Sequence, residues 1–518
     1  MARMVPTLGR RGWCRARVTA APLAALLLMS AVASPAVAAP AIHFGQGDSI
    51  AIDQPRVSFE MFNTTTGQPD GPQWPLPALL DTGANGVVLT QLAYLDFEHP
   101  EFINPDLYER AQRTDGSFVQ YAELGVGGFE LFDVTAAYEL RIQGLSSTPQ
   151  VHTVDAVRAL GKHDLSIASL PAIVGMPAMV DRRTTLDLTT LINPDPDVYL
   201  GIPYIDVGLE DLPADPDLDA APGSAAHRFH VPFDMWLPPH SDPEEPGDPA
   251  PTFAPMPFVD NVTLHRGSEQ ISRRMLVDTG AQLSIISTNT ALALGIDPVA
   301  DAEDYIEIGG IGDIIEAPLV SLDRLILPTN QGPGLAIDGL YVAIIDIGED
   351  IVDLDGIIGM NILSSGYATA IIELLGDLGD LWPGEPVEGI DIERPGMFRR
   401  VHFEFAGWDD DATGRMVLDL NPAYDGLDAI LGDMNLDGIV DAVDVAQFVL
   451  ALTDPEAYVQ QHGAPPDLLG DVNRDGSFDA ADVAPFVERL VTGAASVPEP
   501  GSAALLAATA CLLLRRRR

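Results

Sequence analysis

Positive charge is scarce in this chain of 518 residues. Lysine and arginine together number 28 against 76 aspartates and glutamates, so the formal net charge is −48, and Lys162 is the one lysine. Nucleic-acid binding needs a basic surface that neutralises phosphates, so this composition excludes that class of function. A strongly acidic surface instead favours solubility and repulsion from anionic surfaces.

Cysteine is almost absent. Cys14 and Cys511 are the two cysteines, and both lie in terminal segments. The body between them therefore has no disulfide, and its stability must come from core packing, with bound metal as a further source. Apolar residues make up 47% of the chain, which is enough for large cores. Without its two ends the chain keeps roughly 460 residues, which suits two lobes and a small module.

Both ends of the chain predict export. Residues 1–38 read as a signal peptide, with five arginines, an apolar core from Ala20 to Val32 and the small-residue cleavage site Ala36-Val37-Ala38. At the other end, Val497-Pro498-Glu499-Pro500 precedes a short apolar run and four arginines. Residues 494–518 therefore resemble a bacterial PEP-CTERM sorting tail. The resemblance implies transient membrane anchoring, an exosortase-like processing enzyme, and delivery to the cell surface, outer envelope or extracellular matrix; a permanent membrane tail is the alternative.

One short phrase occurs twice. Leu79–Ala84 reads LLDTGA and Leu276–Ala281 reads LVDTGA, and each is followed by a second apolar run. Further landmarks recur in the same order, namely a glycine-rich hairpin tip (Leu124–Gly128, then Gly309–Asp313) and an apolar pair before glycine (Ala172–Met176, then Gly356–Met360). A carboxylate at the end of a buried strand is costly unless it has a role. Two such carboxylates on two copies of a repeat suggest a facing pair.

These motifs resemble the pepsin and retropepsin clan of aspartic peptidases over roughly residues 45–420. The resemblance implies a mainly β, bilobal fold of two related β-barrel lobes. It also implies an aspartic endopeptidase that acts on a peptide or protein and needs no cofactor for catalysis. Asp81 and Asp278 would be the catalytic dyad, sharing one proton and activating a water between them. The supporting residues would be Thr82, Gly83, Thr279 and Gly280. Tyr121 occupies the place of a flap tyrosine, although its neighbours do not match a pepsin flap well and an ordinary strand tyrosine is slightly favoured.

A second pair of repeats carries oxygen ligands at the spacing of a calcium loop. Glycine stands at loop position 6 in each copy, where the loop must turn sharply. The predicted ligands of two Ca²⁺ ions are Asp433, Asn435, Asp437, Ile439 (by its carbonyl), Asp441 and Asp444, then Asp471, Asn473, Asp475, Ser477, Asp479 and Asp482. Each loop is followed by an expected helix, Val443–Leu452 and Val483–Val491. The pattern resembles a small α-helical, EF-hand-like type I dockerin, which implies a cohesin-type partner; a calcium-stabilised spacer is the alternative.

The resulting domain map has six parts. It comprises a signal peptide (1–38), a first lobe (39–207), a linker (208–225), a second lobe (226–420), the calcium module (433–493) and the sorting tail (494–518). The acidic, proline-rich stretch Pro238–Pro255 is expected to be disordered or a surface loop. Besides the peptidase, the sequence allows a non-catalytic surface protein that binds or attaches through the same fold and the calcium module.

Overall fold

The computed structural model describes residues 41–47, 54–71, 77–90, 107–125, 128–146, 150–161, 172–192, 204–212, 228–238, 248–311, 314–330, 332–347, 354–364, 396–408, 412–421 and 431–493. The predicted signal peptide and sorting tail lie outside these residues. Among the helices of the described segments, none is long and apolar enough to cross a membrane.

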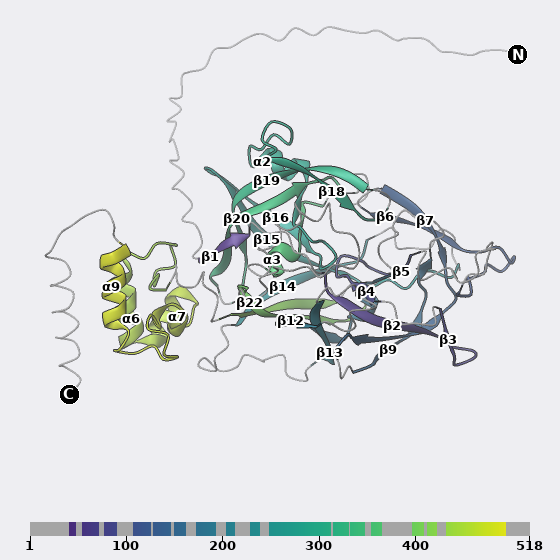
Figure 1. The fold of residues 1–518 in the computed structure, drawn as a ribbon, viewed down its shortest axis with the longest axis horizontal. Helices are drawn as coiled ribbons and strands as arrows, with labels where there is room; N and C mark the ends of the chain where they lie inside the picture. Colours follow the sequence, from purple (N-terminus) through teal and green to yellow (C-terminus); the bar gives the residue numbers. More distant parts are fainter. Residues whose placement is uncertain are drawn as a thin grey trace, which may run out of the picture. The chain divides into compact units, whose positions relative to one another are not determined.

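Ten of the described strands form the smaller of two sheets (Figure 1). They are β2 (Arg56–Asn63), β3 (Pro69–Asp70), β4 (Pro77–Leu80), β5 (Val87–Leu89), β6 (Gln120–Gly125), β7 (Gly128–Val134), β8 (Tyr138–Gly144), β9 (His152–Val157), β10 (Leu160–Gly161) and β11 (Ala172–Val174). Their order is β6-β7-β10-β5-β11-β4-β2-β8-β9, with β3 beside β2. Buried and half-buried residues alternate along β8, as expected for a strand with one face on the core.

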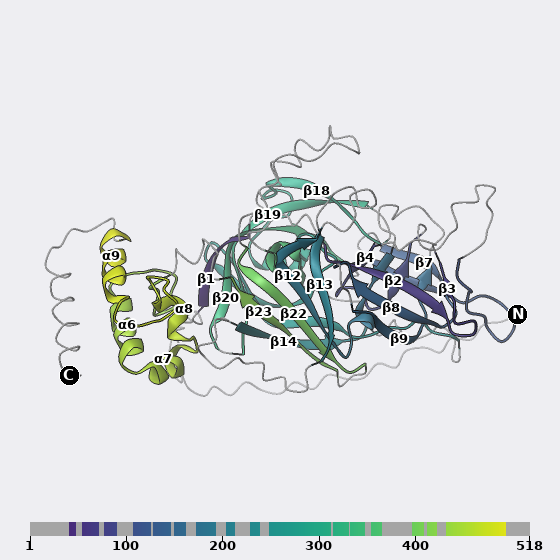
Figure 2. The same ribbon diagram turned by 60° about the horizontal axis from the view of Figure 1, so that its bottom comes forward.

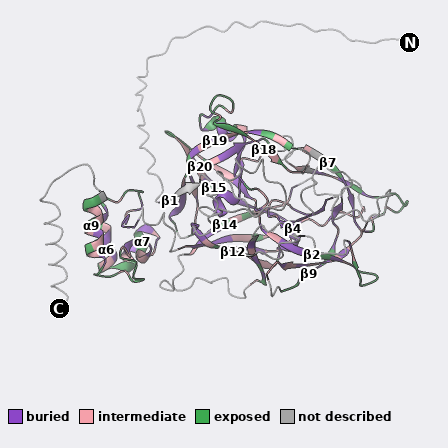
Figure 3. Ribbon diagram, in the orientation of Figure 1, coloured by how far each residue is buried: buried purple, intermediate pink, exposed green. Residues whose placement is uncertain are grey.

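The larger sheet contains thirteen strands. They are β1 (Ala41–Gly47), β12 (Arg182–Ile192), β13 (Tyr204–Asp211), β14 (Arg228–Trp236), β15 (Met256–Arg266), β16 (Glu269–Val277), β17 (Ile285–Ile286), β18 (Asp304–Gly309), β19 (Ile314–Leu327), β20 (Gly334–Ile344), β21 (Gly356–Ile358), β22 (Phe398–Ala406) and β23 (Thr413–Leu420). Short helices η2 (Met176–Ala178), α2 (Thr288–Ala293) and α3 (Met360–Leu363) accompany the sheets. Most residues of β20 are buried, as the colouring in Figure 3 shows. The prediction of a mainly β fold is confirmed.

The strands do not divide between the sheets where the predicted lobes divide. β12 lies within the predicted first lobe, and β13 crosses its predicted end at residue 207. However, β12 pairs with β22 of the predicted second lobe. Figure 2 shows β12, β13, β22 and β23 side by side. Arg183 stands directly opposite Glu404 in this pairing and forms an ion pair with it. Gly208–Asp211 belong to β13 rather than to a linker. Strand propensity is visible in the sequence, but the partner strand is not, because it lies about two hundred residues away.

Of the stretch Pro238–Pro255, residues 248–255 form a loop without helix or strand, as one of the two expectations had it, but this loop is partly buried. Residues 248–255 pack on the first lobe, and Ala254 is fully buried. Ala254 N donates to Asn85 O at 2.8 Å, and Thr252 N donates to Arg158 O at 3.0 Å. The ring centroid of Phe253 lies 5.2 Å from that of Tyr121. Composition suggested a solvated loop, but these pairings satisfy the backbone and cover apolar side chains.

The last described segment is helical. Its helices are α6 (Asp444–Thr453), α7 (Pro455–His462), α8 (Pro466–Gly470) and α9 (Val483–Gly493). α6 and α9 begin within one residue of the helices expected after the two acidic loops, whereas α7 and α8 were not expected. Phe448 and Phe486 occupy the same position in the two repeats, and their rings stack with centroids 4.0 Å apart. The repeats therefore share one small core.

Candidate active site and acidic loops

The two Asp-Thr-Gly segments have the same strand surroundings. β4 leads into Asp81 and pairs in parallel with β11, while β16 leads into Asp278 and pairs in parallel with β21. Asp81 N donates to Val174 O at 3.1 Å, and Asp278 N donates to Ile358 O at 3.0 Å. The apolar pair before each downstream glycine therefore lies beside the Asp-Thr-Gly loop of its own copy, as the repeat predicted.

Each carboxylate is held by the backbone of its own loop. Gly83 N and Ala84 N donate to Asp81 Oδ1 at 2.7 and 3.1 Å. Gly280 N and Ala281 N donate to Asp278 Oδ1 at the same two distances. Two N–H donors fix each side chain in one orientation and favour its ionised form.

The two loops interlock through their threonines. Thr82 Oγ1 donates to Val277 O and Thr279 Oγ1 donates to Leu80 O, both at 2.7 Å. Each hydroxyl also accepts the other threonine's N–H, at 3.1 and 3.0 Å. Both threonines are buried. These four bonds set the separation between the loops that carry the aspartates.

Glycine is required at the third position because the loops approach so closely. A Cβ on Gly280 would lie 2.5 Å from Asp81 Cγ, and a Cβ on Gly83 would lie 2.6 Å from Asp278 Oδ2. Real Cβ atoms essentially never come within 3.0 Å of another heavy atom. Each glycine therefore makes room for the opposite carboxylate.

The two carboxyls form one proton-sharing pair. They are joined by a side-chain hydrogen bond, and burial raises the pKa of both. The charge of Asp278 and this hydrogen bond raise the pKa of Asp81 further, while the same bond lowers that of Asp278. Like charges this close cannot both ionise cheaply, so the pair keeps one proton over a range of pH.

Two hairpins, β6–β7 and β18–β19, meet near their tips. Gly125 ends β6 and lies so close to Ile311 that any side chain at position 125 would overlap the Cβ of Ile311. Ile311 also packs on a buried cluster of the first lobe that includes Tyr121 and Phe132. Tyr121 is 5% exposed, which is the placement of a core strand residue, and we assign it no flap role.

Part of this chain is similar to a known protein family. Residues 262–362 match the model of a family described as aspartyl protease, and this range contains Asp278–Ala281 and the β21 strand beside them. The chain carries an aspartic-protease-like domain. Among solved structures, basic 7S globulin from soybean aligns at 10% identity and a TM-score of 0.29, covering 60% of this chain and 90% of that one. No curated protein matches the sequence.

The two acidic loops have matching conformations. At position 4, Leu436 and Arg474 have φ of 61° and 57°, and at position 6, Gly438 and Gly476 have φ of 87° and 86°. The first carboxylate of each loop accepts the glycine N–H at 2.9 Å, Asp433 from Gly438 and Asp471 from Gly476.

The last carboxylate of each loop also points inward. Asp444 accepts N–H groups from Asn435 and Asp441 at 2.9 and 2.8 Å, and Asp482 is held in the same way in the second loop. Burial raises the pKa of Asp433 to about 6, and the charge of Asp444 adds to this. Within the described segments, no group of three or more His, Cys, Asp or Glu side chains is arranged to hold a metal ion. The inward oxygens at positions 1 and 12, which belong to buried residues except at the half-buried Asp471, nevertheless fit a hard cation such as Ca²⁺.

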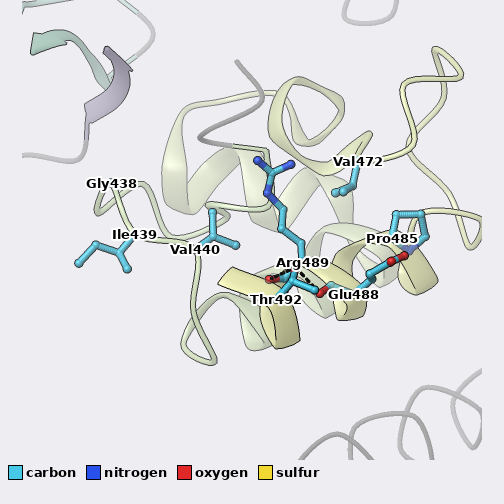
Figure 4. Close-up of a pocket in the computed structure, with 8 residues that line it drawn as sticks. All are labelled: Gly438, Ile439, Val440, Val472, Pro485, Glu488, Arg489 and Thr492. Atoms are coloured by element: carbon cyan, nitrogen blue, oxygen red, sulfur yellow. Dashed lines mark hydrogen bonds between the residues drawn. The ribbon is translucent and has the colours of Figure 1, made fainter. Parts of the chain in front are cut away.

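An open groove of about 760 Å³ lies within the helical segment (Figure 4). Gly438, Ile439 and Val440 of the first loop line one part, and Glu488, Arg489 and Thr492 of α9 line another, together with Val472 and Pro485. Ile439 is 61% exposed. None of the aspartates predicted as calcium ligands lines the groove.

Sequence reasoning missed two contacts at the candidate active site. One is Gln54, whose side-chain amide donates to Gly280 O. The other is the segment 248–255, which holds the first loop through Ala254 and Phe253. Neither contact has a sequence signal, because each joins segments far apart in the chain.

Proposed function

We propose that this protein is an exported, surface-directed aspartic endopeptidase in which Asp81 and Asp278 activate a water molecule. The observation that carries the proposal is the symmetry of the pair. Two carboxyls from two copies of one motif share a hydrogen bond, and each is fixed by two N–H donors of its own loop.

The pair can perform peptide hydrolysis by general acid–base catalysis. Its ionised member accepts a proton from the attacking water, while its protonated member donates to the oxygen of the scissile carbonyl. The intermediate then breaks the C–N bond as the amine takes a proton. No covalent acyl-enzyme forms, because water is the nucleophile, and the protein needs to supply only the two carboxyls.

The substrate class follows from the sheet architecture. An extended peptide bound beside two β-hairpins forms main-chain hydrogen bonds as an added strand does. The contact between Gly125 and Ile311 joins the two hairpins, so we expect a peptide to enter only after they separate. Unfolded or loop segments of proteins fit this requirement best.

The remaining parts of the proposal concern attachment. The loops at 433–444 and 471–482 would hold one Ca²⁺ each through their carboxylate, amide and carbonyl oxygens, and bound calcium would neutralise acids that otherwise repel one another. The module would bind a cohesin-type partner or act as a spacer. The terminal segments would direct export, processing by an exosortase-like enzyme and placement at the cell surface.

Cleavage of a mixed peptide library tests the enzymatic proposal. Purified protein is assayed from pH 3 to 7 with calcium present, beside Asp81→Asn and Asp278→Asn. Activity in the wild type that both variants lose, and that a statine-type transition-state mimic blocks, supports the dyad. A folded, calcium-loaded wild type that cleaves nothing at any pH would overturn it and favour a binding protein on the same fold.

A further inference from the structure

Gln54 joins the beginning of the described chain to the second active loop. It lies two residues before β2, and its Nε2 donates to the carbonyl oxygen of Gly280, 226 residues away. Gln54 is half-buried. A residue of the first lobe therefore contacts the loop that carries Asp278.

The hydrogen bond from Gln54 affects the Asp278 carboxylate through one peptide group. The Gly280 carbonyl and the Ala281 N–H belong to the same peptide, and that N–H donates to Asp278 Oδ1 at 3.1 Å. A donor on the oxygen of a peptide polarises it and strengthens the hydrogen bond of its N–H. Gln54 thereby favours negative charge on Asp278 without touching it.

The first loop lacks this contact. Ala84 N donates to Asp81 Oδ1 at the same 3.1 Å, but within the described segments no residue donates to the Gly83 carbonyl. The first loop is held instead at Asn85 O by Ala254 N, and the Asn85–Gly86 peptide makes no bond to Asp81. Since the N–H donors to the two carboxylates match, Gln54 is a difference that distinguishes the two carboxyls.

We infer that Gln54 is a positioning residue that assigns the roles of the dyad, with the negative charge on Asp278 and the proton on Asp81. The inference rests on the proposed function. Asp278 then takes a proton from water as its oxygen bonds to the carbonyl carbon, and the electron pair of the carbonyl moves to oxygen, which takes the proton of Asp81. Collapse of the intermediate breaks the C–N bond; Asp278 gives its proton to the amine and Asp81 regains one from the hydroxyl.

The charges around the pair do not decide between the two carboxyls. In the described part of the chain, the charged group that faces each aspartate is the other aspartate. The hydrogen bond that Gln54 makes to the second loop is therefore the feature that distinguishes them.

The test compares two substitutions with opposite expected signs. Gln54→Met keeps the length of the side chain but removes the donor, whereas Gln54→Lys keeps a donor and adds positive charge. The acid limb of the kcat/KM pH profile should move to higher pH by about half a unit in Gln54→Met and to lower pH in Gln54→Lys. Gln447→Met is the matched control, because Gln447 is half-buried like Gln54 and forms a hydrogen bond with His462 at 3.0 Å within the helical segment, outside the hairpins and the aspartate loops. The pH profile of this variant should not move.

The outcomes separate this inference from the proposed function. An active wild type whose acid limb is unchanged in both Gln54 variants, or moves the same way in both, overturns the role of Gln54 and leaves the peptidase standing. If the wild type cleaves nothing, NMR titration of ¹³C-labelled aspartate carboxyls still follows the pair. Shifts of opposite sign in the two variants then support the charge assignment, and equal titrations reject it.

Discussion

Thr82 and Thr279 are hydrogen-bonded to each other in both directions, each hydroxyl accepting the other residue's N–H. Each hydroxyl also donates across the interface to a carbonyl of the opposite strand. The two residues come from copies of one motif 197 residues apart. Because they form a closed set of four bonds, the geometry of the dyad depends on both lobes folding correctly.

Replacing either threonine by valine should therefore impair stability and activity together. Thr82→Val keeps the shape but leaves Val277 O and Thr279 N without partners, and each buried unsatisfied group costs about 1–3 kcal/mol. Thermal unfolding and peptide cleavage measure the two effects. Thr263→Val is the matched control, since Thr263 has only a 3.4 Å contact with Ser272 on an exposed part of the surface. Equal melting temperatures for the two variants would contradict the interlock.

Gly280→Ala should strongly reduce the rate of peptide cleavage, and it should lower the melting temperature less than Thr82→Val does. The new Cβ would lie 2.5 Å from Asp81 Cγ, so the carboxyl must move away from Asp278. A displacement of this kind costs on the order of 100-fold in rate. Gly208→Ala is the control, because its Cβ would meet Thr185 Cβ at an ordinary 3.7 Å. Cleavage by Gly280→Ala at the wild-type rate would show that the close approach of the two loops is not needed for catalysis.

The sequence was sufficient to predict the local parts of this site. The Asp-Thr-Gly motif is local in sequence, both at Asp81–Gly83 and in the second copy. The strands around each copy follow from the apolar runs on either side of it. The turn geometry of the two acidic loops is equally local, because glycine at position 6 is needed for its positive φ. Repetition supplied the remaining information, since two copies imply two equivalent loops.

Long-range pairing could not be predicted in this way. β12 reads as a strand, but nothing in Arg182–Ile192 shows that it pairs with β22. Gln54 and Phe253 are ordinary residues whose importance arises from contacts made after folding. For the same reason the proline-rich composition before Pro255 suggested a loop, whereas tertiary contacts determine its structure.

Asp81→Asn should stabilise the protein at neutral pH. Burial raises the pKa of Asp81 above that of the unfolded chain, so the folded state holds a proton that the unfolded state releases. This difference in bound protons lowers the free energy of unfolding. The loss is absent below the pKa of Asp81 in the unfolded chain and grows as pH rises from that value to the pKa in the folded protein. The loss then grows no further above the folded pKa. The melting temperature of Asp81→Asn should exceed that of the wild type at pH 7 and match it near pH 3. A variant less stable than wild type at pH 7 would contradict the raised pKa.

Removal of calcium should unfold the helical module first. Without a cation the inward carboxylates of Asp433 and Asp444 face each other at a buried site, and metal binding to such loops is coupled to their folding. Calorimetric titration should give two Ca²⁺ ions for the wild type and one each for Asp433→Ala and Asp471→Ala. A chelator should reduce the helical circular dichroism signal while leaving most of the β signal.

Glu456→Ala is the control for these variants. It removes an acid from the first turn of α7 outside both loops, and it should still bind two ions. Because the loops use matching contacts, a wild type that binds neither ion would reject both sites at once, whereas loss of both ions in a single-loop variant would show that the shared Phe448–Phe486 core couples them.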